Sequence, residues 1–377
     1  MLTSLKIARF KSLVDVTIEL GRVNLFIGAN GSGKSNVLEA LGVLSAAASG
    51  RVDDQSLSRR GVRPGTEEHY KSAFPKLPNV PHIALSAFAD NSDYTVTLWN
   101  PAGTPGAPWR FKSEQLTGNG NKIVGRSPTS LEAPNQEQGM AALKTVELEA
   151  SNPALLLMNQ LRDFAIHDPN TPALRGQGMG LRMEPVCLDG EGLAEAIQGV
   201  PKDATDEALD LIDWAAAIDV VTTHGVSPAS AELVFDDRFM AEGRNRLTAR
   251  DASEGALYVL FYLVLAEHPK APRCLAVDNF GQALNPRLAA KLTSAVCDWT
   301  DRQNGCQWLL TAHNPAVLDG LPLQDPGVRL FTVDRSSLGH TIVRRMDLQE
   351  AIKKRPGDEW TLSRMWMNGL LGAVPSV

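Results

Sequence analysis

The chain has 377 residues and a formal net charge of −6, with 43% hydrophobic and 21% charged residues. This length and composition are those of an ordinary globular protein with one large domain, or with a core domain and a sizeable insertion. The negative net charge excludes a protein whose whole surface binds nucleic acid, although local basic patches are compatible with it.

The sequence contains no stretch of about 18 apolar residues, so we predict that the chain does not span a membrane. Residues 1–13 include Lys6 and Arg9 and no long apolar run, and we therefore expect no secretory signal. The cysteines lack the spacing of a metal site, which predicts structural thiols in a reducing, cytoplasmic compartment. They are Cys187, Cys274, Cys297 and Cys306.

The N-terminal region predicts two paired strands, a buried strand and a helix. Apolar and polar residues alternate over residues 14–20, as in a half-buried strand, and residues 4–10 are the expected hairpin partner. Residues 23–27 form the short apolar run of a buried strand. After Lys34, apolar residues recur at helical spacing, at Val37, Leu38, Leu41 and Leu44.

Between this strand and this helix lies GANGSGKSN, which fits the phosphate-loop pattern GxxxxGK(S/T). Glycines let backbone N–H groups surround phosphates, and the following helix presents its positive N-terminal dipole. We expect Lys34 to reach the β- and γ-phosphates and Ser35 to bind magnesium. The alternative is a chance glycine-rich turn, which composition produces in roughly one chain in a hundred. The predicted nucleotide-binding residues here are Gly28, Ala29, Asn30, Gly31, Ser32, Gly33, Lys34, Ser35 and Asn36.

The segment after this helix is richer in polar residues and proline than the segment before it. Residues 48–80 are polar and broken by glycine and proline, and a second loop-rich stretch covers residues 101–138. Between them, Tyr94, Val96 and Leu98 alternate with threonines in a strand pattern. We therefore predict a β-rich and loop-rich insertion over 48–149. It would divide the nucleotide-binding core into residues 1–47 and 150–345.

The rest of the core predicts alternating helices and strands, which form a mainly parallel sheet with its ligand at the strand ends. Helices are expected over 153–166, 191–200, 254–268 and 286–303, and strands over 230–237, 273–279 and 306–314. Residues 346–377 form an apolar tail, either a packed closing helix or a docking surface for a partner.

Further candidate site residues lie at the ends of these elements. Asp278 ends an apolar strand, where a phosphate-loop protein keeps a carboxylate for magnesium. His313 ends the next strand and could sense a γ-phosphate, or be a satisfied core histidine. Ser253, Glu254 and Gly255 begin a long apolar helix. They could form a second phosphate-binding surface, or an ordinary N-cap in which Ser253 caps the helix.

These signals together resemble the nucleotide-binding domain of ABC-type ATPases, in the branch of RecF, SMC and OLD-like (overcoming lysogenization defect) proteins. The resemblance covers about residues 1–47 and 230–335. It implies a P-loop ATPase head with a mixed sheet and an N-terminal antiparallel hairpin. It also implies ATP and Mg²⁺ as ligands, and a dimer in which two heads sandwich two nucleotides.

Carried over to this chain, the resemblance makes residues 28–36 the Walker A loop and residues 253–255 the signature that contacts a nucleotide on a second protomer. Asp278 becomes the Walker B aspartate and a magnesium ligand together with Ser35, and His313 the switch histidine. Asn285 and Pro286 fall in the loop after Walker B. A polar residue of the early ARFKS segment, Lys11 or Ser12, is expected beside the nucleotide. No glutamine can be assigned to a Q-loop.

The chain departs from this family at Asn279, where relatives commonly carry an acidic residue. An amide can orient the attacking water but cannot accept its proton, and loss of such a base costs about 10²- to 10⁴-fold in rate. We therefore expect slow hydrolysis, or hydrolysis that relies on another group. The predicted catalytic residues are Lys34, Asp278, Asn279 and His313.

Many OLD-like proteins also carry a Toprim nuclease domain, and we expect none in this chain because only about 50 residues follow the last predicted core strand. The preferred hypothesis is an ATP-dependent switch that controls a separate effector, such as a nuclease, in prokaryotic anti-phage defence. One alternative is a RecF-like repair ATPase that binds DNA through basic stretches such as RFKS and through Arg244, Arg246 and Arg250. The other is an ATP-binding scaffold without turnover.

Overall fold

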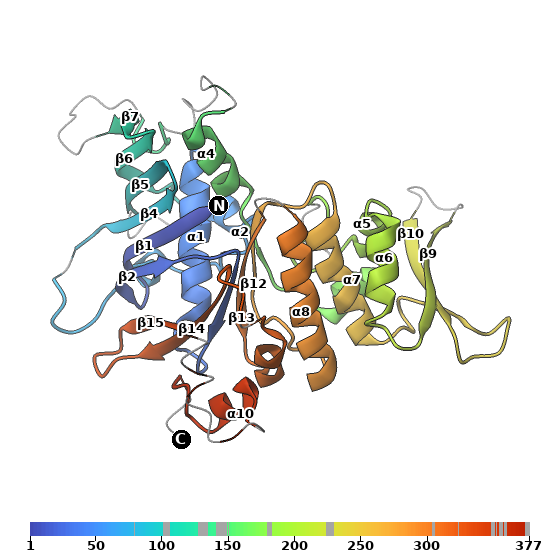
Figure 1. The fold of residues 1–377 in the computed structure, drawn as a ribbon. Helices are drawn as coiled ribbons and strands as arrows, with labels where there is room; N and C mark the ends of the chain where they lie inside the picture. The colour runs from blue at the N-terminus through green and yellow to red at the C-terminus, as the bar shows by residue number, and fades with distance from the viewer. Residues whose placement is uncertain are drawn as a thin grey trace.

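The computed structural model describes residues 1–78, 80–100, 106–126, 135–140, 149, 151–178, 183–223, 230–303, 306–322, 324–347, 351, 353, 357 and 360–373. In this part of the chain, the strands form three sheets, and helices separate and cover them (Figure 1).

The central sheet has the strand order β15-β14-β3-β13-β12-β8. Neighbouring strands from β14 to β8 run parallel, and β15 pairs antiparallel with β14 at the edge. The sheet is therefore mixed, as the sequence predicts. Its strands are β3 (Val23–Ile27), β8 (Ile166–His167), β12 (Cys274–Val277), β13 (Gln307–Ala312), β14 (Val328–Arg335) and β15 (Thr341–Met346).

Two hydrophobic cores lie on opposite faces of this sheet. In β3, Val23, Leu25 and Ile27 pack into one core, and Phe26 packs into the other. Successive side chains of a strand point to opposite faces, so a strand that is covered on both sides needs a continuous apolar run. Each buried Val, Leu or Phe contributes about 1.5–3 kcal/mol. This burial fixes the strand ends on which the site is built.

Helices supply the cover on each face. Helix α1 packs in the core between the central and N-terminal sheets, and α7 and α8 pack in the other core (Figure 1). The α-helices are α1 (Lys34–Ala48), α2 (Asp54–Ser58), α4 (Pro153–Asp163), α5 (Leu193–Ile197), α6 (Lys202–Leu209), α7 (Glu254–Glu267), α8 (Pro286–Arg302) and α10 (Leu362–Met367). Short helical turns of other types are η1 (Glu67–Tyr70), η3 (Ala173–Gln177) and η4 (Pro315–Gly320).

The N-terminal sheet is antiparallel and has the order β2-β1-β4-β5-β6-β7. Its first two strands form the predicted hairpin, in which Leu5 lies opposite Ile18. Its strands are β1 (Leu2–Phe10), β2 (Leu13–Glu19), β4 (Ile83–Ala89), β5 (Ser92–Trp99), β6 (Arg110–Gly118) and β7 (Asn121–Arg126). The strands of segment 48–149 thus extend the hairpin's own sheet, because β4 pairs with β1. The division of the chain into core and insertion stays a prediction, and parts of the loop over 101–138 lie outside the described residues.

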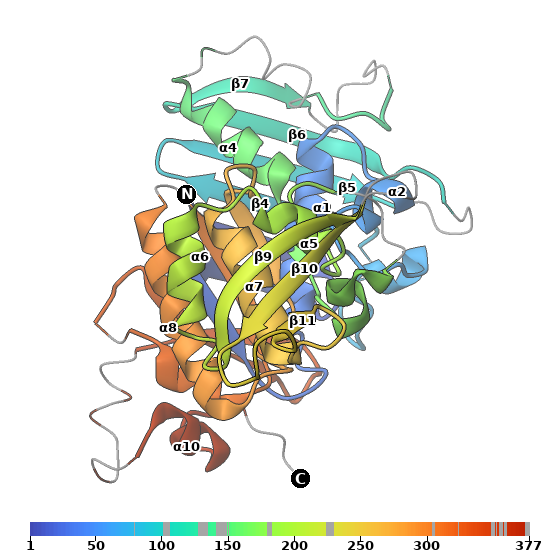
Figure 2. The same cartoon turned by 90° about the vertical axis from the view of Figure 1, so that its right-hand side faces the viewer.

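The third sheet has the order β11-β10-β9 and lies beside α5, α6 and α7 (Figure 2). Its strands are β9 (Ala215–Thr223), β10 (Ser230–Asp237) and β11 (Arg246–Thr248). Leu233 and Phe235 of β10 join the core that contains α7. Strand β11 leads along the chain to the start of α7, where the predicted signature lies.

The predicted helix over 153–166 differs from the structure. Helix α4 ends at Asp163, Phe164 adopts an extended backbone, and residues 166–167 form strand β8. Periodicity alone could not separate this two-residue strand from the apolar helix before it. The predicted helix over 191–200 is likewise shorter, because α5 spans only Leu193–Ile197.

The described part of the tail forms α10, which lies beside η4. Leu362, Met365 and Trp366 are buried in the core with α7 and α8, and Ser363 Oγ donates a hydrogen bond to Asp319 Oδ2 at 2.6 Å. Met367 is 61% exposed. The structure thus packs one side of this helix and leaves another side open.

All four cysteines are buried and free, as expected of structural thiols. Burial raises the pKa of Cys297 to about 12, so its thiol stays protonated. Within the described ranges, we find no helix with the length and apolarity that a bilayer crossing requires.

The pH dependence of stability follows in part from His167 in β8, whose pKa is lowered to about 4 by burial. In the unfolded chain its pKa is about 6.5, so between these values only the unfolded state binds the proton. The free energy of unfolding should therefore fall by about 3 kcal/mol as the pH drops from about 6.5 to 4.

Urea unfolding between pH 7.5 and 4.5 checks this prediction. The His167→Gln variant should show a shallower pH slope than the wild type, and a His69→Gln variant at an exposed position serves as the control. Equal slopes for the wild type and His167→Gln would contradict the assignment.

Candidate nucleotide-binding site

The predicted Walker A loop connects β3 to α1 and contains glycines with left-handed backbone angles. Gly31 and Gly33 have φ angles of 74° and 111°, in the region that favours glycine. A Cβ on Gly33 would collide with Thr341 Oγ1, whereas a Cβ on Gly31 would meet no atom within 4 Å. Gly33 is therefore required by both dihedral and space, and Gly31 by dihedral alone.

Lys34 lies folded back over this loop. Its Nζ donates hydrogen bonds to the carbonyl oxygens of Gly28, at 2.8 Å, and Ala29, at 3.0 Å. Burial lowers the pKa of Lys34 to about 8, and the negative charge of Asp278 opposes this shift. A triphosphate at the loop would supply the negative charge that a buried lysine needs.

Two further side chains of the loop, those of Ser32 and Asn30, differ in exposure. Ser32 Oγ is buried and has no hydrogen-bond partner among the described residues, whereas Asn30 is exposed. Ser32 N–H donates to the carbonyl of Ala29 at 3.2 Å, which closes the loop upon itself. A buried hydroxyl without a partner fits a loop that binds phosphate oxygens.

Ser35 and Asp278, the predicted magnesium ligands, lie together. Ser35 Oγ donates to Asp278 Oδ1 at 3.1 Å, although 243 positions separate them in the chain. Thr311 of β13 donates to the same carboxylate oxygen through its hydroxyl, and accepts the N–H of Asn279 at 3.0 Å. A hydroxyl and a carboxylate are the oxygen donors that Mg²⁺ prefers, so the residues fit this ion.

His313, which follows β13, belongs to the same electrostatic environment. Burial lowers its pKa, the charge of Lys34 lowers it further, and Asp278 raises it. Asn314 holds this loop, because its Nδ2 donates to the carbonyls of Gly281, at 3.0 Å, and Leu284, at 3.2 Å. These hydrogen bonds connect the segment that follows β13 to the segment that follows β12.

The ARFKS segment reaches the loop through Ser12. Asn36 Nδ2 donates to Ser12 Oγ at 2.7 Å, and Thr341 Oγ1 donates to it at the same distance. The side chain of Lys11 instead forms an ion pair with Glu39 of α1, and the side chain of Glu39 is only 2% exposed. Of the two expected residues, Ser12 is the one whose side chain contacts the Walker A segment.

Arg63 is a charged residue near the site that the sequence does not single out. Its Nε lies 2.6 Å from Glu39 Oε1, and this hydrogen bond is the main reason that its pKa is raised. Asp278 and Asp168 also raise it. Glu39 therefore holds the positively charged guanidinium of Arg63 where the charges of Asp278 and Asp168 act on it.

The predicted signature residues lie at the start of α7. Ser253 occupies the N-cap position, but its side chain does not cap the helix. Instead, Ser253 Oγ accepts a hydrogen bond from Trp214 Nε1 at 3.1 Å. Ser253 and Glu254 are exposed, and Thr171 Oγ1 donates to Glu254. The helix N-terminus thus remains open toward solvent, which is the arrangement that favours an external anion.

A cavity of about 470 Å³ opens beside this helix start, and its lining includes Trp214, Ser253, Gly255 and Asn285. Asn285 itself caps α8, because its Oδ1 accepts the N–H of Leu288 at 2.9 Å. The cavity therefore joins the predicted signature to the loop after Walker B.

Asn279 adopts a φ of 59°, a left-handed conformation that asparagine tolerates better than most residues. Its Nδ2 donates to Asp168 Oδ1 at 3.3 Å. Asp168 directly follows β8, and the sequence did not point to it. The signal available in the sequence was an acidic residue two positions after the end of a predicted helix.

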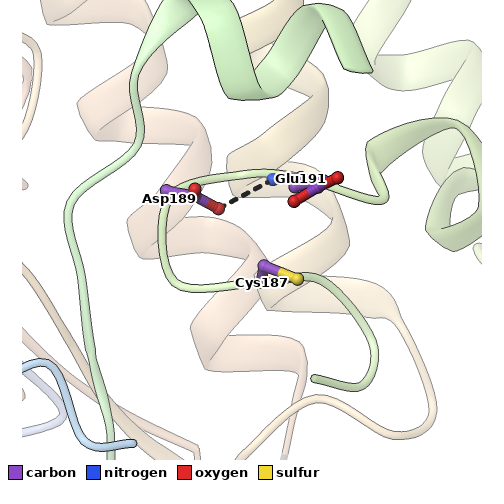
Figure 3. A group of neighbouring side chains, drawn as sticks. All are labelled: Cys187, Asp189 and Glu191. Atoms are coloured by element: carbon purple, nitrogen blue, oxygen red, sulfur yellow. Dashed lines mark hydrogen bonds between the residues drawn. The ribbon is translucent and has the colours of Figure 1, made fainter. Parts of the chain in front are cut away.

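The loop over residues 187–191 supports Asp168. Its backbone carbonyls of Leu188 and Asp189 accept the N–H groups of Asp168, at 2.9 Å, and Asn170, at 3.0 Å. Within the loop, Asp189 Oδ1 accepts the N–H of Glu191 at 3.1 Å (Figure 3). Cys187 also lies near these carboxylates. The loop is thus a folded support for the strand end at β8.

Comparisons with known proteins agree with this architecture. Residues 1–94 match the family described as AAA ATPase domain. The chain is similar to an SMC head solved in complex with the C-winged helix domain of ScpA, at 12% identity and a TM-score of 0.57, covering 93% of this chain and 99% of that one. It is also similar to an SMC head from Pyrococcus furiosus bound to the C-terminal domain of ScpA, at 10% identity and a TM-score of 0.53, covering 93% and 98%. No curated protein sequence matches the chain.

The chain therefore has the fold of an SMC head, which is a P-loop NTPase fold. This similarity confirms the α/β fold with a mixed sheet and an N-terminal antiparallel hairpin that the sequence predicts.

The two loop glycines offer a direct test of the Walker A geometry. Gly31→Ala should cost about 1 kcal/mol of unfolding free energy, because it meets only the left-handed backbone penalty. Gly33→Ala should cost about 3 kcal/mol or more, because it also displaces Thr341 from its hydrogen bonds to Ser12 and to the carbonyl of Ser32. Denaturant unfolding without nucleotide measures both. Equal costs would contradict the close contact between Gly33 and β15.

Proposed function

We propose that this chain is an ATP-driven switch that closes into a dimer on Mg-ATP, hydrolyses the nucleotide slowly and controls a separate effector. The observation that carries the proposal is the open start of α7. Ser253 is exposed and its side chain does not cap the helix, so we expect the N–H groups of Glu254 and Gly255 to meet a phosphate from a second copy. The resemblance to ABC-type heads implies the same sandwich.

Binding follows from the residues at the ends of β3 and β12. Backbone N–H groups of the Walker A loop and the ammonium of Lys34 would bind the β- and γ-phosphates, and Ser35 and Asp278 would hold Mg²⁺. When bound, this ion neutralises charge on the phosphate oxygens. Thr311 keeps the carboxylate of Asp278 oriented toward Ser35. His313 lies in the same field as Lys34 and is suited to respond to added phosphate charge.

Slow turnover is the second part of the proposal. An amide at position 279 can orient water but cannot take its proton. A long-lived ATP state then becomes the signal, because the closed dimer persists until hydrolysis. The scaffold hypothesis differs only in that hydrolysis never occurs.

The proposed effector is a separate protein. The structurally similar SMC heads were solved with domains of ScpA, a separate partner protein. By analogy, we propose that this head also acts on a partner, and the resemblance to OLD-like proteins favours a nuclease in anti-phage defence. Met367 and Leu370 of the tail, both more than half exposed, are one surface available for such a partner.

The DNA-binding alternative receives less support from the side chains. Lys11 of the ARFKS segment pairs with buried Glu39, and Arg246 lies 3.5 Å from Asp236 and 3.7 Å from Asp219. Cations that are neutralised by carboxylates contribute little to phosphate binding. Arg9, which is partly buried, and Arg244 and Arg250, which are exposed, would be the remaining contacts.

Light scattering tests the proposed dimer. Mg-ATP should double the mass of the wild type, whereas Lys34→Ala should stay monomeric because it loses the phosphate contact. Ser253→Arg should bind ATP with nearly normal affinity but also stay monomeric, because the new side chain fills the surface that meets the second copy. Lys202→Ala, an exposed lysine on α6, is the control.

Two results would contradict this function. One is a wild-type mass that does not change with Mg-ATP. The other is a Ser253→Arg protein that dimerises as readily as the wild type.

A further inference from the structure

The end of β8 brings the carboxylate of Asp168 to the site, beside Asp278 and Asn279 at the end of β12. β8 pairs in parallel with β12, with Ile166 opposite Ala276 and His167 opposite Val277. The N–H of Asp278 donates to the carbonyl of His167 at 2.8 Å, which continues this register by one residue. Asp168 therefore leaves its strand at the level at which Asp278 and Asn279 leave theirs.

Asp168 is held in this position from three sides. Its N–H is bonded to the carbonyl of Leu188, and Asn279 Nδ2 lies 3.3 Å from its carboxylate. Tyr258 of α7 donates to the carbonyl of the next residue, Pro169, at 3.0 Å. A catalytic group on a rigid element keeps its geometry better than one on a free loop.

The surroundings of Asp168 suit a proton acceptor. Its side chain lies at an exposed strand end, where water has access. Desolvation raises the pKa of its carboxyl, and the charge of Asp278 raises it as well, while Asn279 and Arg63 act in the opposite direction. A raised pKa makes a carboxylate a stronger base.

The neighbouring acidic groups have other partners. Asp278 accepts hydrogen bonds from Ser35 and Thr311 on the same oxygen and is assigned to Mg²⁺. Glu39 is paired with Lys11 and Arg63, and Glu254 accepts a hydrogen bond from Thr171. Asp168 is the carboxylate that directly contacts Asn279, the residue at the position of the missing acid.

We propose that Asp168 is the general base of ATP hydrolysis in this chain, working as a pair with Asn279. The Oδ1 atom of Asn279 orients a water molecule, and its Nδ2 atom holds the carboxylate of Asp168. As the water oxygen forms a bond to the γ-phosphorus, its O–H bond breaks and the proton passes to Asp168. The bond between the γ-phosphorus and the bridging oxygen breaks, ADP keeps that oxygen, and Asp168 later releases the proton to solvent.

This inference rests on the proposed ATPase function and deepens it. It assigns Asp168 as the group that accepts the proton in place of the acid that is missing at position 279. It also separates proton transfer from magnesium binding, since the two carboxylates come from neighbouring strands.

The experiment compares single-turnover phosphate release with ATP binding in the full chain. Asp168→Asn keeps the shape and the hydrogen-bond acceptor for Asn279 but removes the base. Release should fall by about 10²- to 10⁴-fold. The dissociation constant for a fluorescent ATP analogue should change by less than about threefold, and the ATP-dependent dimer should live longer. Asp163→Asn, five positions earlier on α4, is the matched control and should hydrolyse ATP at the wild-type rate.

A double variant tests whether the carboxylate itself is required. The exchange D168N/N279D returns one carboxylate to the same pair and should recover at least about tenfold of the rate lost in D168N. A merely structural role of Asp168 would not predict this recovery.

Three results would overturn the role of Asp168. They are wild-type hydrolysis in Asp168→Asn, equal rates in Asp168→Asn and the double variant, and a wild-type chain that releases no phosphate at all. The proposed switch is judged separately by mass, since failure of the wild type to dimerise with ATP contradicts that function whatever the rates of these variants.

Discussion

The parallel pairing of β3, β13, β12 and β8 is the constraint on which the site depends. Parallel strands end at the same edge of a sheet, so each contributes the residues that follow it to one row. The Walker A loop follows β3, His313 follows β13, Asp278 and Asn279 follow β12, and Asp168 follows β8. The apolar side chains on both faces of these strands hold the register. The chemistry of the site is therefore a consequence of core packing as much as of the polar residues themselves.

Much of this arrangement could be predicted from the sequence. Long apolar runs and clear periodicity indicated β3, β12, β13, α1, α7 and α8, and the glycine pattern indicated the phosphate loop. These signals are local, because a buried strand or a glycine-rich turn requires particular residues within a short window. The ends of α4 and α5 were less well predicted, since helix boundaries depend on tertiary contacts.

The residues that escaped prediction share a different property. Thr311, Thr341, Arg63 and Asp168 act through partners that are distant in the sequence. The bond between Asn279 and Asp168 joins residues 111 positions apart, and that between Thr341 and Ser12 joins residues 329 positions apart. Neither pair has a sequence pattern, because each exists only once strand order and register are set. Strand β8 has two residues, which is too short to produce a periodic signal.

The bond between Trp214 and Ser253 has a consequence for observing this molecule. An indole that donates its N–H to a hydroxyl changes its fluorescence when that hydroxyl finds another partner or when water is expelled from around the ring. Because Trp214 also lines the cavity at the start of α7, a second copy that engages Ser253 would alter the polarity around a natural chromophore. The chain thus carries a natural chromophore at the surface where two heads would meet.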